Sequence, residues 1–155
     1  MQVEQRLLKY VSYWTTSDEN NMADGKIQIP STGRQFDLGK VLEQELRDLG
    51  LKNVILTDHC YVYGLLPATA GCEGHKAVGF ISHMDTAPDY SGKDVKPQII
   101  PDYDGGDVRL NGTGAMLNAQ TDDVQGLLKV MLYSWILAKI VGWISKKLQM
   151  RKTIK

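Results

Sequence analysis

The sequence predicts an α/β fold in which helices flank a mixed β-sheet. Apolar residues recur every three or four positions in residues 3–14 and 34–49, the spacing of a helix that packs by one face. Two β-rich runs, 53–57 and 61–66, are separated by a short polar link, which indicates antiparallel neighbours. The run 77–82 is continuously apolar, as expected for a central strand covered on both faces.

A polar loop is expected after the first predicted helix. Residues 15–35 contain Gly25, Pro30 and Gly33, which disfavour a regular element. Within the helix at 3–14, the residues expected to face the core are Val3, Leu7, Leu8, Val11 and Trp14.

The second predicted helix has a signal at each end. Ser31 or Thr32 can supply an oxygen that caps its N-terminus, and Gly50 stands where a left-handed C-terminal cap is needed. Its expected buried positions are Phe36, Val41, Leu42, Leu46 and Leu49, whereas Glu43, Glu45 and Arg47 are expected to face water.

Length and charge narrow the class of protein. A chain of 155 residues can form one domain with a hydrophobic core, and its 43% hydrophobic and 23% charged residues are typical of globular proteins. The 18 basic and 18 acidic side chains give a net charge of +0, so no basic excess favours nucleic acid as a partner. Cys60 and Cys72 are expected to stay reduced, and no signal peptide pattern is present, so a cytoplasmic location is expected.

The last two segments of the chain differ from the rest. Residues 88–121 are expected to be a loop, with candidate short strands at 98–100 and 108–110. The mostly apolar segment 127–144 predicts a helix, and a basic tail follows it. That helix could pack with imperfect cover, lie on a membrane surface or span a membrane, and Lys139 near its middle disfavours spanning. Self-association or membrane-surface contact is therefore a candidate property of this end of the chain.

His83 and Asp85 directly follow the predicted central strand. Residues two apart in extended structure point to the same side, roughly 6.5–7 Å apart along the chain. The C-terminal end of such a strand opens into the crevice where α/β sheets bind ligands. There an imidazole can bind a metal, and a carboxylate can orient the imidazole or bind as well. The alternative is a strand-end histidine that is satisfied locally.

Two further carboxylates, Asp122 and Asp123, open the predicted C-terminal helix. An aspartate at a helix start caps free N–H groups and complements the helix dipole. Asp122 and Asp123 cannot both cap the helix, so the carboxylate of one of them remains available for a role other than capping.

A longer pattern surrounds His83. The segment 79–100, GFISHMDTAPDYSGKDVKPQII, resembles the segment of the peptidase T family that carries its first zinc ligand. Members of that family are zinc-dependent aminopeptidases that act on tripeptides. The resemblance covers roughly residues 4–110, with further matches at Pro30-Ser31-Thr32, Leu49-Gly50-Leu51, Asn53-Val54, Leu66-Pro67-Ala68 and Gly105-Gly106-Asp107.

The resemblance implies a zinc-peptidase-type mixed sheet and a hydrolase that releases the N-terminal residue of short peptides with water activated between two zinc ions. It implies that His83 is a zinc ligand, that Asp85 is the active-site aspartate supporting it, and that Asp122 bridges the metal ions. Residues 1–126 would be the N-terminal part of the catalytic domain, truncated before the dimerisation (lid) domain. Residues 127–155 would be a divergent hydrophobic helix with a basic tail.

Other residues that the family uses have no counterpart in this sequence. The family has an adjacent Glu-Glu pair, one member acting as general base and the other as ligand, whereas this sequence has none. Its last glutamate is Glu73 and its last histidine is His83. A catalytic zinc needs about three protein ligands and a base near its water. The sequence therefore predicts an incomplete, inactive member of the family; the alternative is a non-catalytic remnant or interaction module with at most weak metal binding.

Overall fold

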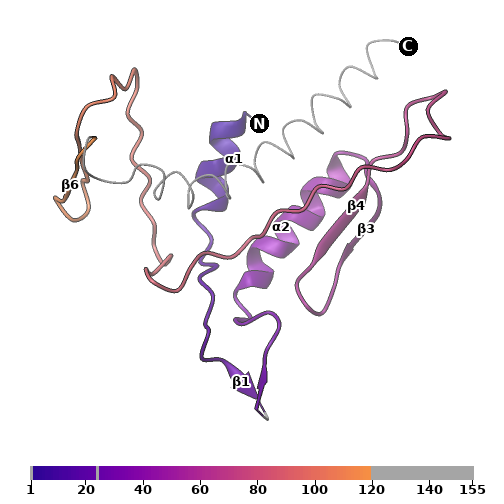
Figure 1. Ribbon diagram of the computed structural model, residues 1–155, viewed down its shortest axis with the longest axis horizontal. Coiled ribbons are helices and arrows are strands. Elements are labelled where there is room, and N and C mark those ends of the chain that lie inside the picture. The colour runs from indigo at the N-terminus through magenta and orange to yellow at the C-terminus, as the bar shows by residue number, and fades with distance from the viewer. Residues whose placement is uncertain (1, 24, 120–155) are drawn as a thin grey trace.

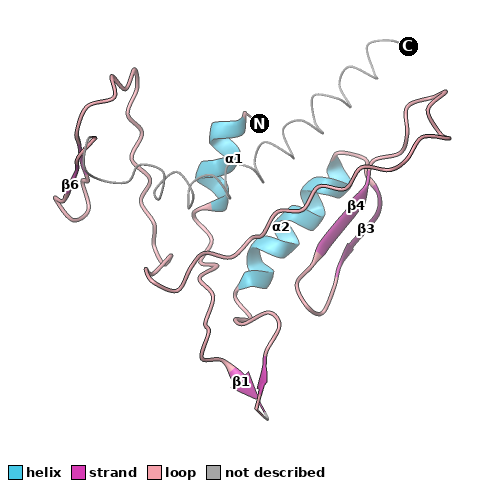
Figure 2. Ribbon diagram, viewed as in Figure 1, coloured by secondary structure: helices cyan, strands magenta, loops and turns pink. Residues whose placement is uncertain are grey.

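The computed structural model describes residues 2–23 and 25–119 (Figure 1). Within these ranges the chain forms two helices and six short strands, a small α/β structure (Figure 2). The predictions for residues 120–155, including the C-terminal helix and the role of Asp122, lie outside the described residues. In chain order the elements are α1 Val3–Tyr10, β1 Met22–Ala23, β2 Lys26–Ile27, α2 Gln35–Asp48, β3 Lys52–Leu56, β4 Val62–Leu65, β5 Val108–Arg109 and β6 Met116–Leu117.

Helix α1 is confirmed, but it ends at Tyr10 and not near Trp14. Beyond Tyr10 the chain turns more tightly than a helix: the Tyr13 N–H donates to the Tyr10 carbonyl at 3.1 Å, and the Ser12 hydroxyl donates to the Lys9 carbonyl at 2.6 Å. These bonds reach only three residues back, so they close the last turn and stop the helix.

The N-terminal loop contains a small hairpin that the sequence did not predict. Strands β1 and β2 pair antiparallel within residues 15–35, with Met22 opposite Ile27. Gly25 has a φ of +71°, a left-handed conformation that suits the tight turn between the two strands.

Helix α2 ends as the sequence predicts. Gly50 has a φ of +81°, which is left-handed. Its N–H donates to the Arg47 carbonyl at 2.8 Å, and the Leu51 N–H donates to the Leu46 carbonyl at 3.1 Å. The two bonds form a Schellman motif, which satisfies carbonyls that the end of a helix leaves open.

The prediction that Ser31 or Thr32 caps α2 is wrong. The N-cap residue is Arg34, and no side chain caps the first turn. Both hydroxyls have other partners: Ser31 Oγ accepts a bond from the Asp18 N–H at 3.0 Å, and Thr32 Oγ1 donates to the Thr16 carbonyl at 3.2 Å. The hydroxyls therefore join the loop after α1 to the start of α2.

The hydrophobic core lies where α1 meets α2. Tyr10 from α1 and Leu38 and Leu42 from α2 are buried together. Half-buried apolar residues pack against them: Val3, Leu7, Tyr13, Val62 and Met84. The predicted stripes are thus right in part, because Val3, Leu7 and Leu42 contribute whereas Trp14 remains 38% exposed.

Glu45 points inward, contrary to the prediction that it faces water. Its side chain is only 14% exposed and accepts bonds from Lys9 Nζ at 2.6 Å and from the Tyr10 hydroxyl at 2.7 Å. Arg6 Nε lies 3.9 Å from the same carboxylate. Burial, together with the bond to Glu45, raises the pKa of Tyr10 above its ordinary value. The carboxylate of Glu45 in α2 is therefore the common partner of three polar side chains of α1.

The antiparallel pairing of β3 and β4 is confirmed. Ile55 lies opposite Tyr63, and Leu56 lies opposite Val62. The hairpin lies along α2 (Figure 1). On the side away from the helix its apolar side chains stay about half exposed: Ile55, Tyr61, Tyr63 and Leu65.

The prediction that residues 77–82 form a buried central strand is wrong. The segment forms no strand, and Val78, Phe80 and Ile81 are exposed, Ile81 to 98%. The described residues form three separate two-stranded antiparallel sheets, with no mixed sheet among them. An apolar run becomes a central strand only when neighbouring strands and covering layers exist.

The later segment contains one of its two predicted strands. Strand β5 is present and pairs with β6, whereas residues 98–100 form no strand. Gln98 instead uses its side chain, which donates a hydrogen bond to the Arg109 carbonyl at 3.1 Å and accepts one from the Asn111 N–H at 3.1 Å.

Across residues 2–23 and 25–119, no helix has both the length and the apolar character that crossing a membrane requires.

Candidate functional site

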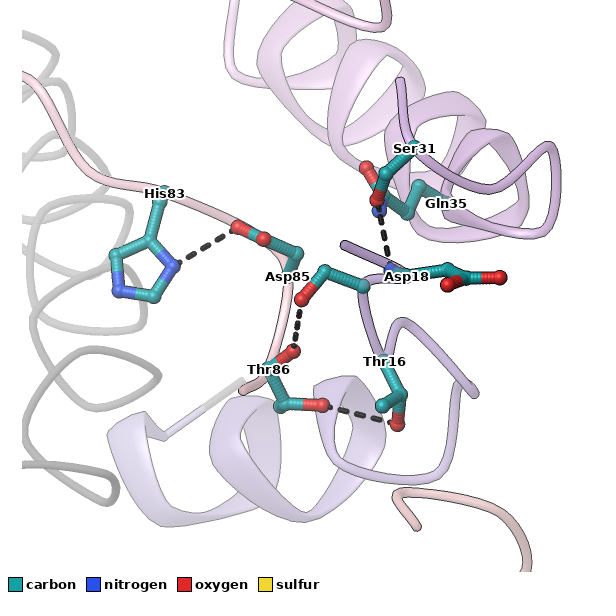
Figure 3. A network of polar contacts seen from close by, with 8 residues as sticks. Thr16, Asp18, Ser31, Gln35, His83, Asp85 and Thr86 are labelled. Carbon is teal, nitrogen blue, oxygen red and sulfur yellow. Dashed lines mark hydrogen bonds and ion pairs between the residues drawn. The ribbon is translucent and has the colours of Figure 1, made fainter. Parts of the chain in front are cut away.

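The predicted site residues His83 and Asp85 lie together after the apolar run 77–82. His83 Nδ1 and Asp85 Oδ1 are 3.0 Å apart, and the two side chains point toward each other (Figure 3). Met84, between them, packs against the core formed by Tyr10, Leu38 and Leu42. Side chains alternate between the two sides of an extended chain, so Met84 points inward while His83 and Asp85 lie on the other side. The side chains of His83 and Asp85 are both partly exposed.

The contact between the two residues assigns the protons of the imidazole. A carboxylate accepts hydrogen bonds only, so His83 Nδ1 carries the proton that is shared with Asp85. In a neutral imidazole the lone pair is then on Nε2. Metal-binding histidines commonly hold a carboxylate in this way, which fixes the tautomer and the ring orientation. The pair is therefore suited to supply one imidazole ligand and the carboxylate that orients it.

The residue after Asp85 is anchored to the loop that follows α1. Thr86 and Thr16 form a parallel β-bridge. In it the Thr86 N–H donates to the Thr15 carbonyl at 3.3 Å, and the Ser17 N–H donates to the Thr86 carbonyl at 3.0 Å. The Ser17 hydroxyl donates to the same carbonyl at 3.0 Å. Backbone bonds thus hold the chain next to the His83–Asp85 pair.

Thr16 is the centre of this anchor, and its residue surface is only 6% exposed. Its Oγ1 accepts a bond from Thr86 Oγ1 at 3.1 Å (Figure 3). It also accepts a bond from the Gly92 N–H at 2.8 Å. Its carbonyl accepts a bond from Arg34 Nη2 at 2.7 Å, in addition to the one from Thr32 described above. Sequence reasoning missed Thr16 because a threonine in a polar loop gives no signal, and the two partners of its hydroxyl lie 70 and 76 residues away.

Positive charge lies beside the anchor. The guanidinium carbon of Arg34 is 4.0 Å from the centre of the Trp14 ring, and Lys93 Nζ is 5.5 Å from it. Both distances are in the range of cation–π contacts. Trp14 was predicted to face the core, and its ring is instead partly exposed and faces these cations.

The two other histidines lie outside the pair. His59 is exposed, contacts Asp58 with Nδ1 at 2.8 Å from Oδ1, and stacks on Tyr61. His75 is exposed. Neither the sequence nor the described contacts recruit them to His83.

The described residues fit one ligand position of a zinc site and not a whole catalytic site. A catalytic zinc takes about three protein ligands. Across residues 2–23 and 25–119, no group of three or more His, Cys, Asp or Glu side chains is arranged to hold a metal ion. The pair supplies one imidazole and its orienting carboxylate, and Asp122, the second predicted ligand, lies outside the described ranges.

Comparison with known proteins supports the resemblance drawn from residues 79–100. The chain is 46% identical over 121 residues to peptidase T of Alkaliphilus oremlandii, which covers 76% of this chain and 28% of that protein. It is 47% identical over 110 residues to peptidase T of Clostridium acetobutylicum (71% of this chain, 26% of the relative). With peptidase T of Caldanaerobacter subterraneus subsp. tengcongensis it shares 49% identity over 109 residues (70% and 25%).

These matches confirm that the chain is similar to the N-terminal portion of peptidase T. The chain spans about a quarter of the length of these curated relatives. No protein-family model matches it.

Proposed function

We propose that this chain, which is similar to the N-terminal portion of peptidase T, is part of a zinc-dependent peptidase domain and contributes the His83–Asp85 pair to its metal site. The observation that carries the proposal is the 3.0 Å contact between His83 Nδ1 and Asp85 Oδ1 within the segment 79–100. That contact gives the imidazole the tautomer in which Nε2 can bind a metal.

In the complete domain the reaction would be hydrolysis of a short peptide at its N-terminal residue, with tripeptides as substrates. A zinc ion supplies a Lewis acid and lowers the pKa of its bound water. His83 would hold the metal, Asp85 would orient the imidazole, and Asp122 would be a second ligand. The assignment of Asp122 rests on the sequence alone.

We further propose that the chain has no peptidase activity on its own. His83 and Asp122 would give two metal ligands, and the sequence has no glutamate after Glu73 that could serve as general base. Loss of a general base typically lowers the rate by roughly 10²- to 10⁴-fold. Metal affinity would also be weak, because water would fill most of the coordination shell.

A second candidate function is a non-catalytic remnant or interaction module. The exposed apolar segment 77–82 favours this candidate, because large apolar surfaces on soluble proteins commonly mark contact sites. Self-association or membrane-surface contact through residues 127–155 and a cytoplasmic location stay predictions from the sequence. The division into a peptidase part, 1–126, and a divergent tail, 127–155, is also a proposal.

Calorimetric titration with Co²⁺ and Zn²⁺ tests the metal site. We expect weak binding that is lost in His83→Ala and retained in His59→Ala. The second variant is a matched control, because His59 also contacts an aspartate through Nδ1, at 2.8 Å. Binding that survives His83→Ala, or that is lost in both variants, would move the site away from the proposed pair.

A further inference from the structure

We propose that Thr16 is a positioning residue whose hydroxyl fixes the Asp85–Thr86 end of the His83–Asp85 pair. The proposal rests on the proposed function only in taking that pair as a metal site. Four polar groups from three segments of the chain meet at Thr16, and the pair ends at Asp85, one residue before Thr86 in one of these segments.

The chain beside Asp85 supplies an anchor of this kind. The side chains of His83 and Asp85 are 47% and 38% exposed. Asp85 is placed by the backbone on either side of it: Met84 packs against the core, and Thr86 is bound to the loop after α1. Of these two supports, only the second involves directed hydrogen bonds.

The Thr16 hydroxyl makes hydrogen bonds that the backbone bridge between Thr16 and Thr86 does not provide. The bridge fixes the Thr86 N–H and carbonyl, whereas Thr16 Oγ1 binds the Thr86 side chain and the Gly92 N–H. It thereby ties both ends of the turn 86–92 to one buried atom. Loss of the hydroxyl would leave the bridge in place and release the turn.

Gly92 shows how close this packing is. A Cβ at this position would lie 2.7 Å from Thr16 Oγ1, which is closer than Cβ atoms come to a neighbour, and 3.1 Å from Thr86 Oγ1, which is a tight contact. The turn therefore approaches the hydroxyl as closely as a backbone N–H can, and only glycine leaves the space for it.

Thr16 is itself held firmly. Its carbonyl accepts bonds from Thr32 Oγ1 and Arg34 Nη2 at the start of α2. The position of α2 is thus transmitted through Thr16 to Thr86 and then to Asp85. Residues that orient a metal-binding side chain through hydrogen bonds typically change metal affinity roughly 10- to 100-fold when they are replaced.

The experiment compares three threonine variants in the full chain. Thr16→Val removes the hydroxyl with little change of shape, and Thr16→Ser retains it. Thr57→Val is the matched control, because Thr57 Oγ1 also accepts a backbone N–H, that of Tyr61 at 3.0 Å, in the turn between β3 and β4. Unchanged far-ultraviolet circular dichroism of each variant establishes that the fold is retained.

Three quantities are measured in each variant. The first is the amide exchange rate of Gly92; the second is the tautomer of His83, from ¹⁵N NMR of the metal-free protein at a pH where the imidazole is neutral. The third is Co²⁺ affinity. For Thr16→Val we expect faster exchange of the Gly92 amide, a mixture of tautomers at His83 and about 10-fold weaker Co²⁺ binding. Thr16→Ser should match the wild type in all three quantities, and so should Thr57→Val.

The outcomes separate the two proposals. If Thr16→Val leaves the His83 tautomer unchanged, or if Thr16→Ser fails to restore it, the positioning role is overturned. If the wild type binds no Co²⁺ while the tautomer responds to Thr16→Val and is restored by Thr16→Ser, the metal site is overturned and the positioning role stands.

Discussion

The Tyr10 hydroxyl donates a 2.7 Å hydrogen bond to Glu45, and this contact joins α1 to α2 at the edge of the core. Arg6 and Lys9 approach the same carboxylate. Arg6 is buried, and its Nε and Nη1 have no hydrogen-bond partner among the described residues, so its charge depends on the nearby Glu45. Glu45 is therefore the group on which the polar contact between the helices depends.

We expect Glu45→Ala to lower the free energy of unfolding by about 3 kcal/mol, because it leaves the Arg6 charge and the Tyr10 hydroxyl buried without a partner. Glu43→Ala is the control: Glu43 pairs with Arg47 on the surface of the same helix, at 2.6 Å, and such pairs contribute about 0.5 kcal/mol or less. Urea unfolding followed by circular dichroism measures both variants. Equal losses would show that the inward position of Glu45 does not matter.

The same contact predicts a loss of stability in base. Since the pKa of Tyr10 in the folded chain is raised above its ordinary value of 10.0, the folded state holds this proton when the unfolded state begins to release it. The contribution is complete below the unfolded pKa and is lost as pH rises above about 10. Urea midpoints at pH about 8 and about 11 should therefore differ less in Tyr10→Phe than in the wild type. A wild-type difference that Tyr10→Phe leaves unchanged would exclude this cause.

Gly50 is expected to resist substitution for a backbone reason. At a φ of +81° and with no atom near the position of a Cβ, alanine would meet strain and no clash. We expect Gly50→Ala to lower the free energy of unfolding by about 1 kcal/mol. Gly33→Ala, which is equally open and has no positive φ, should change it by less than about 0.5 kcal/mol. The comparison is a pair of urea titrations, and indistinguishable midpoints would contradict it.

The purified chain should release no free amino acid from a tripeptide when zinc or cobalt is added. The reason is chemical, since no glutamate follows Glu73 to act as general base. A ninhydrin assay at increasing protein concentration, with and without chelator, is the measurement. Release of free amino acid that increases with protein concentration and disappears with chelator would show that the chain is an active peptidase, and the prediction would be wrong.

Removal of residues 127–155 should change the association state. The expected cause is the apolar run 127–144 together with the basic residues after it. Sedimentation of the full chain and of chain 1–126, with and without vesicles that contain anionic lipid, makes the test. A full chain that sediments as a monomer and does not bind vesicles would refute this expectation.

The sequence predicted those elements whose signals are local. The helical spacing of α1 and α2, the left-handed cap at Gly50 and the antiparallel β3–β4 pair were all recoverable, because each depends on residues within one or two turns. Glu45 was misplaced because its partners lie on another helix, more than 30 residues away. The strand at 77–82 was wrong because its burial depends on neighbours that the described residues do not include.

The candidate site was predictable to a similar extent. The spacing of His83 and Asp85 placed them on one side of extended chain, and the structure brings their side chains to 3.0 Å. Thr16 could not be predicted, since a hydroxyl in a loop acquires its partners only when the chain returns at Thr86 and Gly92. The spacing of apolar residues in a sequence reveals which face of an element is buried. A single hydrogen bond between distant segments produces no such repeating pattern, so the sequence does not reveal it.

The exposed segment 77–82 has a consequence for the handling of the protein. An extended apolar run such as Ala-Val-Gly-Phe-Ile-Ser offers its edge to another copy in the manner of cross-β pairing, and the runs that do so most readily have high β-propensity and no charge. His83 is the next residue, so fibrillar stacking through this run would bring the histidines of successive copies close together. If metal binding decreases during storage, we expect fibril formation through this run to be the cause. Thioflavin fluorescence of the same sample would then rise as metal binding falls.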